Sequence, residues 1–218
     1  MIEIKNLTKS YDKKCILKNI NLKINDNEQV SIIGKSGCGK STLLRCIARL
    51  EKIDKGQILI DNENINNIKK FYNKVGMVFQ SFNLFENMTV LENLIIAPVK
   101  LKIQTKDEAI KLAKGYLKEI NLENKINEYP KNLSGGEKTL AILSFIFALQ
   151  KTPPFFILDE ADAALDKDNI ERLNAYIQAQ DLQFIVISLK DYFFKNADSL
   201  IGIYKSNNES KILSYKFQ

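Results

Sequence analysis

Residues 34–42 read Gly-Lys-Ser-Gly-Cys-Gly-Lys-Ser-Thr, a spacing of glycines before Lys40 and Ser41 that is typical of a phosphate-binding loop. The glycines let backbone N–H groups curl around a phosphate chain, and the N-terminus of a following helix adds partial positive charge. The Lys40 ammonium can reach the β- and γ-phosphates, and the Ser41 hydroxyl can ligate Mg²⁺. The simpler alternative is a glycine-rich turn before an ordinary helix, but the spacing favours nucleotide binding. The residues expected to bind the nucleotide are Gly34, Lys35, Ser36, Gly37, Cys38, Gly39, Lys40, Ser41 and Thr42.

A second group of candidate residues follows the apolar run Phe155–Leu158, which is typical of a strand buried on both faces. Asp159 and Glu160 come directly after it, at the carboxyl end where open α/β sheets bind ligands. Asp159 is a candidate Mg²⁺ ligand, directly or through water, and Glu160 is a candidate base for the attacking water. Alone, the pattern fits a strand that ends in a polar loop equally well. The phosphate-binding loop in the same chain decides in favour of the functional interpretation.

A third motif, Leu133-Ser-Gly-Gly-Glu137, precedes a long apolar helical pattern. Ser134 is a good N-cap, and Gly135 and Gly136 expose backbone N–H groups beside the expected helix N-terminus. In isolation the motif is an ordinary capped loop. Together with the phosphate-binding loop, it predicts a second phosphate-binding surface in the same chain.

The remaining pattern predicts the elements that position these residues. The stretch from Thr89 to Leu149 is mostly helical in pattern, and Thr105 with Glu108 forms a capping box. A core-packing face is expected for Ala109, Leu112, Ala113, Tyr116, Leu117 and Ile120. Strands are expected near Ile2–Lys5, Cys15–Ile24, Gln29–Ile33, Gln57–Ile60, Val75–Phe79, Phe155–Leu158, Gln183–Ser188, Ser199–Tyr204 and Lys211–Tyr215. With a helix from Ser41 to Leu50, the plan is an α/β nucleotide-binding core interrupted by a helical insertion.

The composition limits the class of protein. The chain has 218 residues, 45% of them hydrophobic, which suits a soluble globular protein with a substantial core. No apolar run reaches the roughly 18 residues that span a bilayer, and the N-terminal sequence shows no charged-then-apolar leader, so neither a membrane span nor secretion is expected. Cys15, Cys38 and Cys46 show no metal-site spacing, which fits a reducing compartment. The net charge of +6 is spread without a basic block, and the lack of histidine excludes imidazole as a base or metal ligand.

The three motifs occur in the order found in the nucleotide-binding domain of the ATP-binding-cassette (ABC) superfamily, which the chain resembles over essentially its whole length. The resemblance implies an α/β fold, with a P-loop NTPase (ABC-type) core, an antiparallel β subdomain and a helical subdomain insertion. Residues 1–218 would form a single nucleotide-binding domain. Its ATP-binding core would comprise 1–85 and 150–218, and its helical subdomain about 86–149.

The resemblance also implies a role for each matching residue. Tyr11 would stack on adenine, with simple packing as its alternative, and Gln80 resembles the loop glutamine that touches Mg²⁺ and the attacking water. Ser134 and Gly136 would bind a γ-phosphate held by a partner molecule, and Asp166 would meet that partner across a dimer interface. The expected catalytic residues are Glu160, Gln80 and Lys40; the expected metal ligands are Ser41, Gln80 and Asp159; the expected nucleotide contacts outside the loop are Tyr11, Ser134, Gly135, Gly136 and Asp166.

The two parts of the chain resemble different members of this superfamily. Residues 1–132 are similar to ATPase subunits of bacterial polar amino-acid importers, for example in Val78-Phe-Gln-Ser-Phe-Asn-Leu-Phe85 and Met88-Thr-Val-Leu-Glu-Asn93. Residues 133–218 resemble the C-terminal head segment of cohesin-type structural-maintenance-of-chromosomes (SMC) proteins, through Asp159-Glu-Ala-Asp-Ala-Ala-Leu-Asp166. This predicts a mosaic, either natural, engineered or designed.

Two consequences follow from the resemblance. The position matching the γ-phosphate histidine of importer ATPases is Leu189. We therefore expect hydrolysis to be slow and to depend more heavily on Glu160 and on Ser134, Gly135 and Gly136 of the partner molecule. Residues 81–133 leave no room for the long coiled coil of an SMC protein, so entrapment of DNA in a ring is not expected.

The first functional hypothesis is an ATP-binding and ATP-hydrolysing subunit of an ABC transporter, by resemblance for polar amino acids. It would use ATP and Mg²⁺, and it would form a homodimer across ATP. Integral-membrane permease subunits would hold it at the inner face of the cell membrane, on the cytoplasmic side, and no direct nucleic-acid binding is expected. The alternative is a soluble SMC-head-like module, switched by ATP to dimerise and linked to chromosome proteins.

Overall fold

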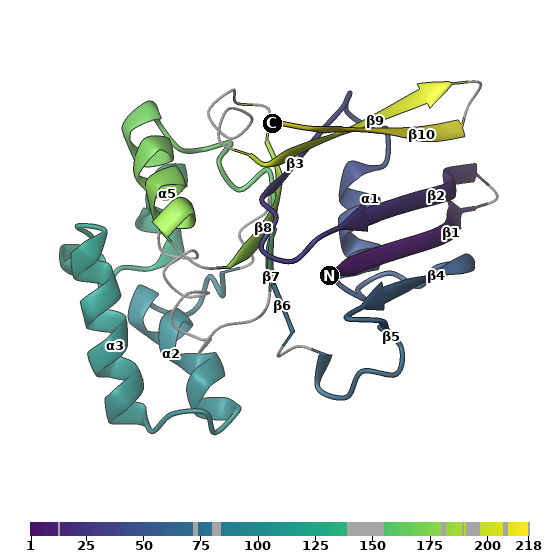
Figure 1. The fold of residues 1–218 in the computed structure, drawn as a ribbon. Coiled ribbons are helices and arrows are strands. Elements are labelled where there is room, and N and C mark those ends of the chain that lie inside the picture. Colours follow the sequence, from purple (N-terminus) through teal and green to yellow (C-terminus); the bar gives the residue numbers. More distant parts are fainter. Residues whose placement is uncertain are drawn as a thin grey trace. The chain divides into compact units, whose positions relative to one another are not determined.

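The computed structural model describes residues 1–12, 14–71, 74–79, 84–138, 155–179, 182–188, 190, 197–206 and 209–217 (Figure 1). The chain divides into two compact units. The first unit comprises Met1–Met77, Pro153–Glu160 and Asn174–Gln218, and the second comprises Val78–Thr152 and Ala161–Leu173.

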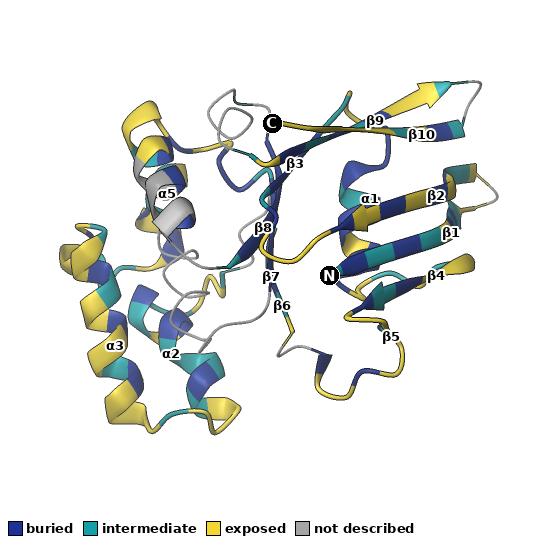
Figure 2. Ribbon diagram, in the orientation of Figure 1, coloured by how far each residue is buried: buried dark blue, intermediate teal, exposed yellow. Residues whose placement is uncertain are grey.

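A four-stranded antiparallel sheet belongs to the first unit. Its strands are β1 (Ile2–Tyr11), β2 (Lys14–Ile24), β4 (Lys55–Ile60) and β5 (Glu63–Asn64), in the order β2-β1-β4-β5. Strand β1 alternates buried and more exposed residues, as one-sided burial requires (Figure 2). The register shifts between Ile4 and Leu7, where Asn6 has a φ of 51°, and the alternation then resumes. Because the alternation resumes after this irregularity, β1 continues to Tyr11, well beyond the predicted end at Lys5.

A six-stranded sheet carries the central part of the fold. Its strands are β3 (Val30–Ile33), β6 (Val75–Val78), β7 (Phe155–Asp159), β8 (Gln183–Ile187), β9 (Ser199–Ser206) and β10 (Glu209–Lys216), in the order β10-β9-β3-β8-β7-β6. Strand β3 is parallel to β8 and β9, and β7 is parallel to β8. Every residue of β7 and β8 is buried (Figure 2), which confirms the expected two-sided burial of the Phe155–Leu158 run.

Helix α1 (Lys40–Ile47) lies between the two sheets of the first unit (Figure 1). Leu43, Leu44, Cys46 and Ile47 are fully buried and join one apolar core with residues of both sheets. The helix is shorter than predicted, because Ala48 is its C-cap and Arg49 takes a positive φ of 58°.

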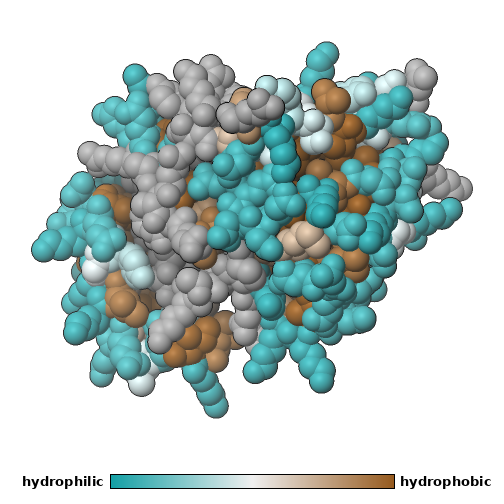
Figure 3. All heavy atoms as spheres, viewed as in Figure 1, coloured by the Kyte–Doolittle hydropathy of each residue, from teal (hydrophilic) through white to brown (hydrophobic). Residues whose placement is uncertain are grey.

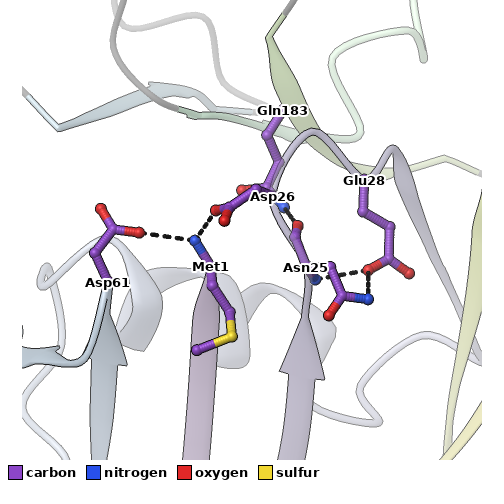
Figure 4. A network of polar contacts seen from close by, with 6 residues as sticks. All are labelled: Met1, Asn25, Asp26, Glu28, Asp61 and Gln183. Carbon is purple, nitrogen blue, oxygen red and sulfur yellow. Dashed lines mark hydrogen bonds and ion pairs between the residues drawn. The ribbon is translucent and has the colours of Figure 1, made fainter.

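Polar contacts around Asn25 and Glu28 join segments of the first unit, and Figure 4 shows part of this network. Glu28 is buried, and its Oε2 accepts hydrogen bonds from the backbone N–H and the side-chain amide of Asn25, at 2.6 and 3.0 Å. Its other carboxylate oxygen accepts a hydrogen bond from the Ser199 hydroxyl and lies 3.3 Å from Lys216 Nζ. Burial alone would raise the pKa of Glu28, but these contacts outweigh it and hold the pKa below its usual value.

The second unit is built mainly of helices. They include α2 (Val90–Lys100), α3 (Lys106–Glu119), the short turns η2 (Glu123–Lys125) and η3 (Pro130–Asn132), and the first part of α5 (Lys167–Ala179). The predicted capping box of Thr105 and Glu108 is confirmed, and Thr89 with Glu92 forms another. Ala109, Ala113 and Leu117 are buried as expected, whereas Leu112 is 41% exposed, so its predicted core role is wrong.

The predicted strands are all present with shifted ends, and β5 is an addition that its two polar residues did not signal. In the part of the chain that the structure describes, no helix combines the length and the apolar character that crossing a bilayer requires. The face drawn in Figure 3 is largely hydrophilic where it is described, with smaller brown patches between the polar side chains.

Candidate nucleotide site

The phosphate-binding loop connects β3 to the start of α1, as the strand–loop–helix pattern predicts. Two of its glycines are required by the backbone. Gly34 has a φ of 151°, and a Cβ there would lie 2.2 Å from the Ile203 carbonyl oxygen; Gly39, the N-cap of α1, has a φ of 105°. Lys35, Ser36 and Gly37 are exposed, Cys38, Gly39 and Lys40 are buried, and Gly34, Ser41 and Thr42 are intermediate. Residues 35–37 of the loop are therefore accessible to solvent, whereas residues 38–40 lie in the interior.

The Lys40 side chain is folded into this loop. Its Nζ donates hydrogen bonds to the carbonyl oxygens of Gly34 at 2.9 Å and Lys35 at 3.3 Å, and the residue is only 6% exposed. The two acceptors that hold the buried ammonium are neutral carbonyl oxygens. A phosphate group is a stronger partner than a carbonyl for such a charge.

Ser41 and Asp159 meet beneath the loop. The Ser41 hydroxyl donates a 2.9 Å hydrogen bond to Asp159 Oδ1, which joins the first turn of α1 to the end of β7. Asp159 is 3% exposed, and burial raises the pKa of its carboxyl despite the opposing effects of Ser41, Arg45 and Lys40. Two of the three residues predicted as metal ligands, Ser41 and Asp159, are thus side by side.

These residues fit a divalent cation. A hydroxyl and a carboxylate are the hard oxygen donors that Mg²⁺ prefers, and Mg²⁺ is commonly held by one or two protein groups together with substrate phosphates. Among the described residues, no group of three or more His, Cys, Asp or Glu side chains could hold a metal by itself. The arrangement therefore suits a cation that arrives with a phosphate chain.

Glu160 follows Asp159 in a constrained backbone position. Its φ is 51°, which is rare for a residue with a side chain, and its N–H donates a 2.9 Å hydrogen bond to the Ile187 carbonyl of β8. Strained backbone of this kind persists only where the surroundings impose it, and it is concentrated at functional sites. The kink turns the chain away from the strand directly after the buried Asp159.

The Ser134 motif lies in the second unit, where the structure adds a feature that the sequence interpretation missed. Ser134 N–H donates to Glu137 Oε2 at 2.7 Å, and Glu137 N–H donates to Ser134 Oγ at 3.2 Å. This is a capping box, and its Ser-x-x-Glu pattern was present in the sequence. Glu137 Oε1 also lies 3.5 Å from Lys125 Nζ, and the Ser134 backbone hydrogen bond lowers the pKa of Glu137. The Ser134 side chain is exposed at the helix N-terminus.

The segment 161–166 contacts this motif within the second unit. A Cβ at Gly135 would lie 2.8 Å from Ala164 Cβ, so only glycine fits there without a shift. Asp166 is exposed and caps α5, because its carboxylate accepts hydrogen bonds from the N–H of Asn169 at 2.9 Å and from the Asn169 amide at 3.2 Å. Gly135, Gly136 and the segment leading to Asp166 therefore form one corner of the second unit.

Tyr11 lies at the end of β1, 38% exposed, with the Lys9 ammonium 4.6 Å from its ring centroid. Gln80 and Leu189 lie outside the described residues, so the predicted metal and switch positions there stay predictions.

The fold and the loop define a P-loop nucleotide-binding protein of mixed α/β architecture. The family model described as ABC transporter matches residues 17–163. The chain belongs to this family.

The comparisons with individual proteins agree with this assignment. The probable ABC transporter ATP-binding protein PEB1C of Campylobacter jejuni is 41% identical over 79% of this chain and 72% of its own length. The glutamine transport ATP-binding protein GlnQ of Bacillus subtilis is 37% identical over 98% of this chain and 89% of its own length. A solved dimeric ATP-binding cassette in a post-hydrolysis state, bound to ADP and Pi, superimposes with a TM-score of 0.86 at 30% identity, covering 100% of this chain and 99% of the other.

Proposed function

We propose that this chain is the ATP-binding and ATP-hydrolysing subunit of an ABC transporter that imports polar amino acids. The observation that carries the proposal is the pairing of Ser41 with the buried Asp159 directly below the Lys40 loop. The names of the relatives support the cargo class, since they include transport proteins for glutamine and for arginine.

Each group of the phosphate site has a distinct task in this proposal. Lys40 exchanges its carbonyl partners for β- and γ-phosphate oxygens, and the loop N–H groups hold the same phosphates. Ser41 and Asp159 hold Mg²⁺, which when bound neutralises charge on the phosphate oxygens. Glu160 accepts the proton of the attacking water, aided by Gln80. Tyr11 stacks on the adenine ring.

The working form is a homodimer with one two-fold interface, which contains a nucleotide at each of two equivalent sites. Ser134, Gly135 and Gly136 of one copy complete the phosphate site of the other, and Asp166 lies at that interface. The exposed Ser134 side chain at a helix N-terminus supports this role, as does the dimeric state of the similar cassette.

A groove of the second unit is the proposed docking surface for a permease. Its volume is about 480 Å³, and its lining combines an apolar strip from α2 with one acidic and two basic side chains. The lining residues are Asn87, Met88, Glu92, Ile95, Ile96, Val99, Lys100 and Lys106. An amphipathic helical segment of a membrane subunit fits such a surface. The chain would then work at the cytoplasmic face of the membrane, held there by its permease. The division into a core (1–85 and 150–218) and a helical subdomain (about 86–149) stays a prediction.

The SMC-head alternative gains no support from the comparisons, and the similarity of residues 133–218 to a cohesin-type segment stays a hypothesis about the origin of that segment. The transporter function is tested by the dependence of ATPase activity on protein concentration. Specific activity should rise cooperatively as the dimer forms. A constant specific activity across the range where the protein changes from monomer to dimer would contradict the paired-site model.

A further inference from the structure

Lys9 and Tyr11 lie two residues apart near the end of β1, where the pairing with β2 shifts register on both sides of Lys9. The Lys9 ammonium stands 4.6 Å from the centroid of the Tyr11 ring. This distance is within the range of a cation–π interaction, which strengthens when the charge is shielded from water. Lys9 is 8% exposed, so its charge is shielded.

A buried ammonium needs a partner, and Glu51 supplies it. Glu51 Oε2 lies 3.3 Å from Lys9 Nζ. Burial alone would lower the pKa of Lys9, but the hydrogen bond and the charge of Glu51 outweigh it and raise the pKa above its ordinary value. Lys9 therefore remains charged throughout the physiological range and is fixed between the carboxylate and the ring.

The consequence concerns the two faces of the Tyr11 ring. Lys9 occupies one face, and the residue as a whole remains 38% exposed. A ring held on one side by a fixed charge has little freedom to turn, so the other side is presented to any planar group that approaches. Pre-ordering of this kind reduces the entropy lost when a base stacks.

We propose that Lys9, anchored by Glu51, is a positioning residue that holds the Tyr11 ring ready to stack on the base of the nucleotide. This proposal rests on the proposed function, because it assumes that Tyr11 contacts the adenine. Lys9 itself does not touch the phosphates. Its loss should therefore weaken binding of ATP and leave binding of inorganic tripolyphosphate, which has no base, unchanged.

The test compares ATP and tripolyphosphate binding by calorimetry in the unmodified full chain and in five variants: Lys9→Met, Lys9→Arg, Lys5→Met, Tyr11→Ala and the double variant Tyr11→Ala/Lys9→Met. Lys9→Met should weaken ATP binding about 3- to 10-fold, while Lys9→Arg should restore most of the affinity. Lys5→Met is the matched control, because Lys5 lies on the same strand and loses an ion pair of 2.9 Å with Glu3 instead. In the Tyr11→Ala background, Lys9→Met should have no further effect. If Lys9→Met does not fold, Lys9→Gln, which also removes the charge but keeps a polar side chain, provides the same comparison.

The outcomes separate the two proposals. If the unmodified chain binds neither ATP nor tripolyphosphate, the proposed function is wrong. If ATP binds and Tyr11→Ala weakens it, but Lys9→Met behaves like Lys5→Met, the positioning role is wrong and the proposed function stands. An equal loss of ATP and tripolyphosphate binding in Lys9→Met would also overturn the positioning role, since it would indicate a general structural effect.

Discussion

Ser41 Oγ donates a 2.9 Å hydrogen bond to Asp159 Oδ1, and this bond links residues that are 118 positions apart in the sequence. It connects the first turn of α1 to the end of β7, the two elements whose termini form the floor of the phosphate site. A carboxylate buried at this point is costly for the folded chain alone, and in the proposed function a cation beside it would offset that cost. Stability and the proposed function are therefore opposed at Asp159.

Replacing Asp159 with asparagine should reveal this opposition. Burial raises the folded-state pKa of Asp159 above its unfolded value, so its contribution to stability falls as pH rises through both values and is unfavourable at neutral pH. Asp159→Asn keeps an acceptor for Ser41 and removes the charge. Its melting temperature without ligand should rise at pH 7, by about 2–4 °C for each kcal/mol relieved, and its stabilisation by Mg²⁺ and ATP should be largely lost.

Thermal melts with and without Mg²⁺ and ATP measure both effects. Ser41→Ala is the contrasting variant, because it removes the hydrogen-bond donor and leaves the buried carboxylate less well satisfied, so its melting temperature should fall. A ligand-free Asp159→Asn that melts well below the parent would show that the carboxylate has a stabilising role that burial alone does not explain.

Lys40→Ala should weaken ATP binding strongly, because the variant removes the buried ammonium of the loop. Charge-assisted hydrogen bonds of this kind are worth about 1.5–3 kcal/mol, so a loss of roughly 10- to 100-fold in affinity is expected by equilibrium titration. Lys35→Ala, at an exposed position of the same loop, is the matched control and should retain most of the affinity.

Glu160→Gln should bind ATP normally, fail to turn it over and accumulate as a dimer, since the proposed base is lost while every phosphate contact remains. Size-exclusion chromatography with multi-angle light scattering, with and without ATP, measures this directly. The double variant Glu160→Gln/Ser134→Arg is the control. An arginine at the exposed position 134 should prevent dimer formation and leave ATP binding by the single chain nearly intact. A dimer that forms equally well in the double variant would place the interface elsewhere.

Glu28 should make the chain sensitive to acid. Its folded-state pKa is below the unfolded value, so it contributes stability above about pH 4.5, the ordinary range of a Glu carboxyl, and that contribution is lost as pH falls through the folded-state pKa. Urea midpoints at pH 7 and at pH 3.5 should therefore differ more in the parent than in Glu28→Gln. The exposed Glu63→Gln serves as control, and an identical pH dependence in all three proteins would refute the role of this network.

The sequence predicts the phosphate loop, the buried strand and its two acids, because these depend on local residue types and on a periodicity that tertiary contacts do not change. Features that depend on distant contacts were not predictable. Strand β1 could be followed only to Lys5, because Asn6 interrupts its alternation and only the paired strand shows that the alternation resumes. Leu112 fits the helical period, but the buried face of α3 is narrower than the pattern suggests and leaves Leu112 at its exposed edge. The capping role of Glu137 is readable from Ser-x-x-Glu, but the sequence analysis assigns a capping role only to Ser134.

The close approach of Ala164 to Gly135 has a mechanical consequence. Gly135 and Ala164 are small residues that approach each other closely, so neither can move far without displacing the other. We therefore expect residues 134–136 and the segment 161–166 to shift together. That segment begins immediately after Glu160 in the chain. In the proposed dimer, a displacement of the Ser134 motif at the neighbour's phosphate would thus reach the peptide next to Glu160 of the same copy, and this would couple the two nucleotide sites.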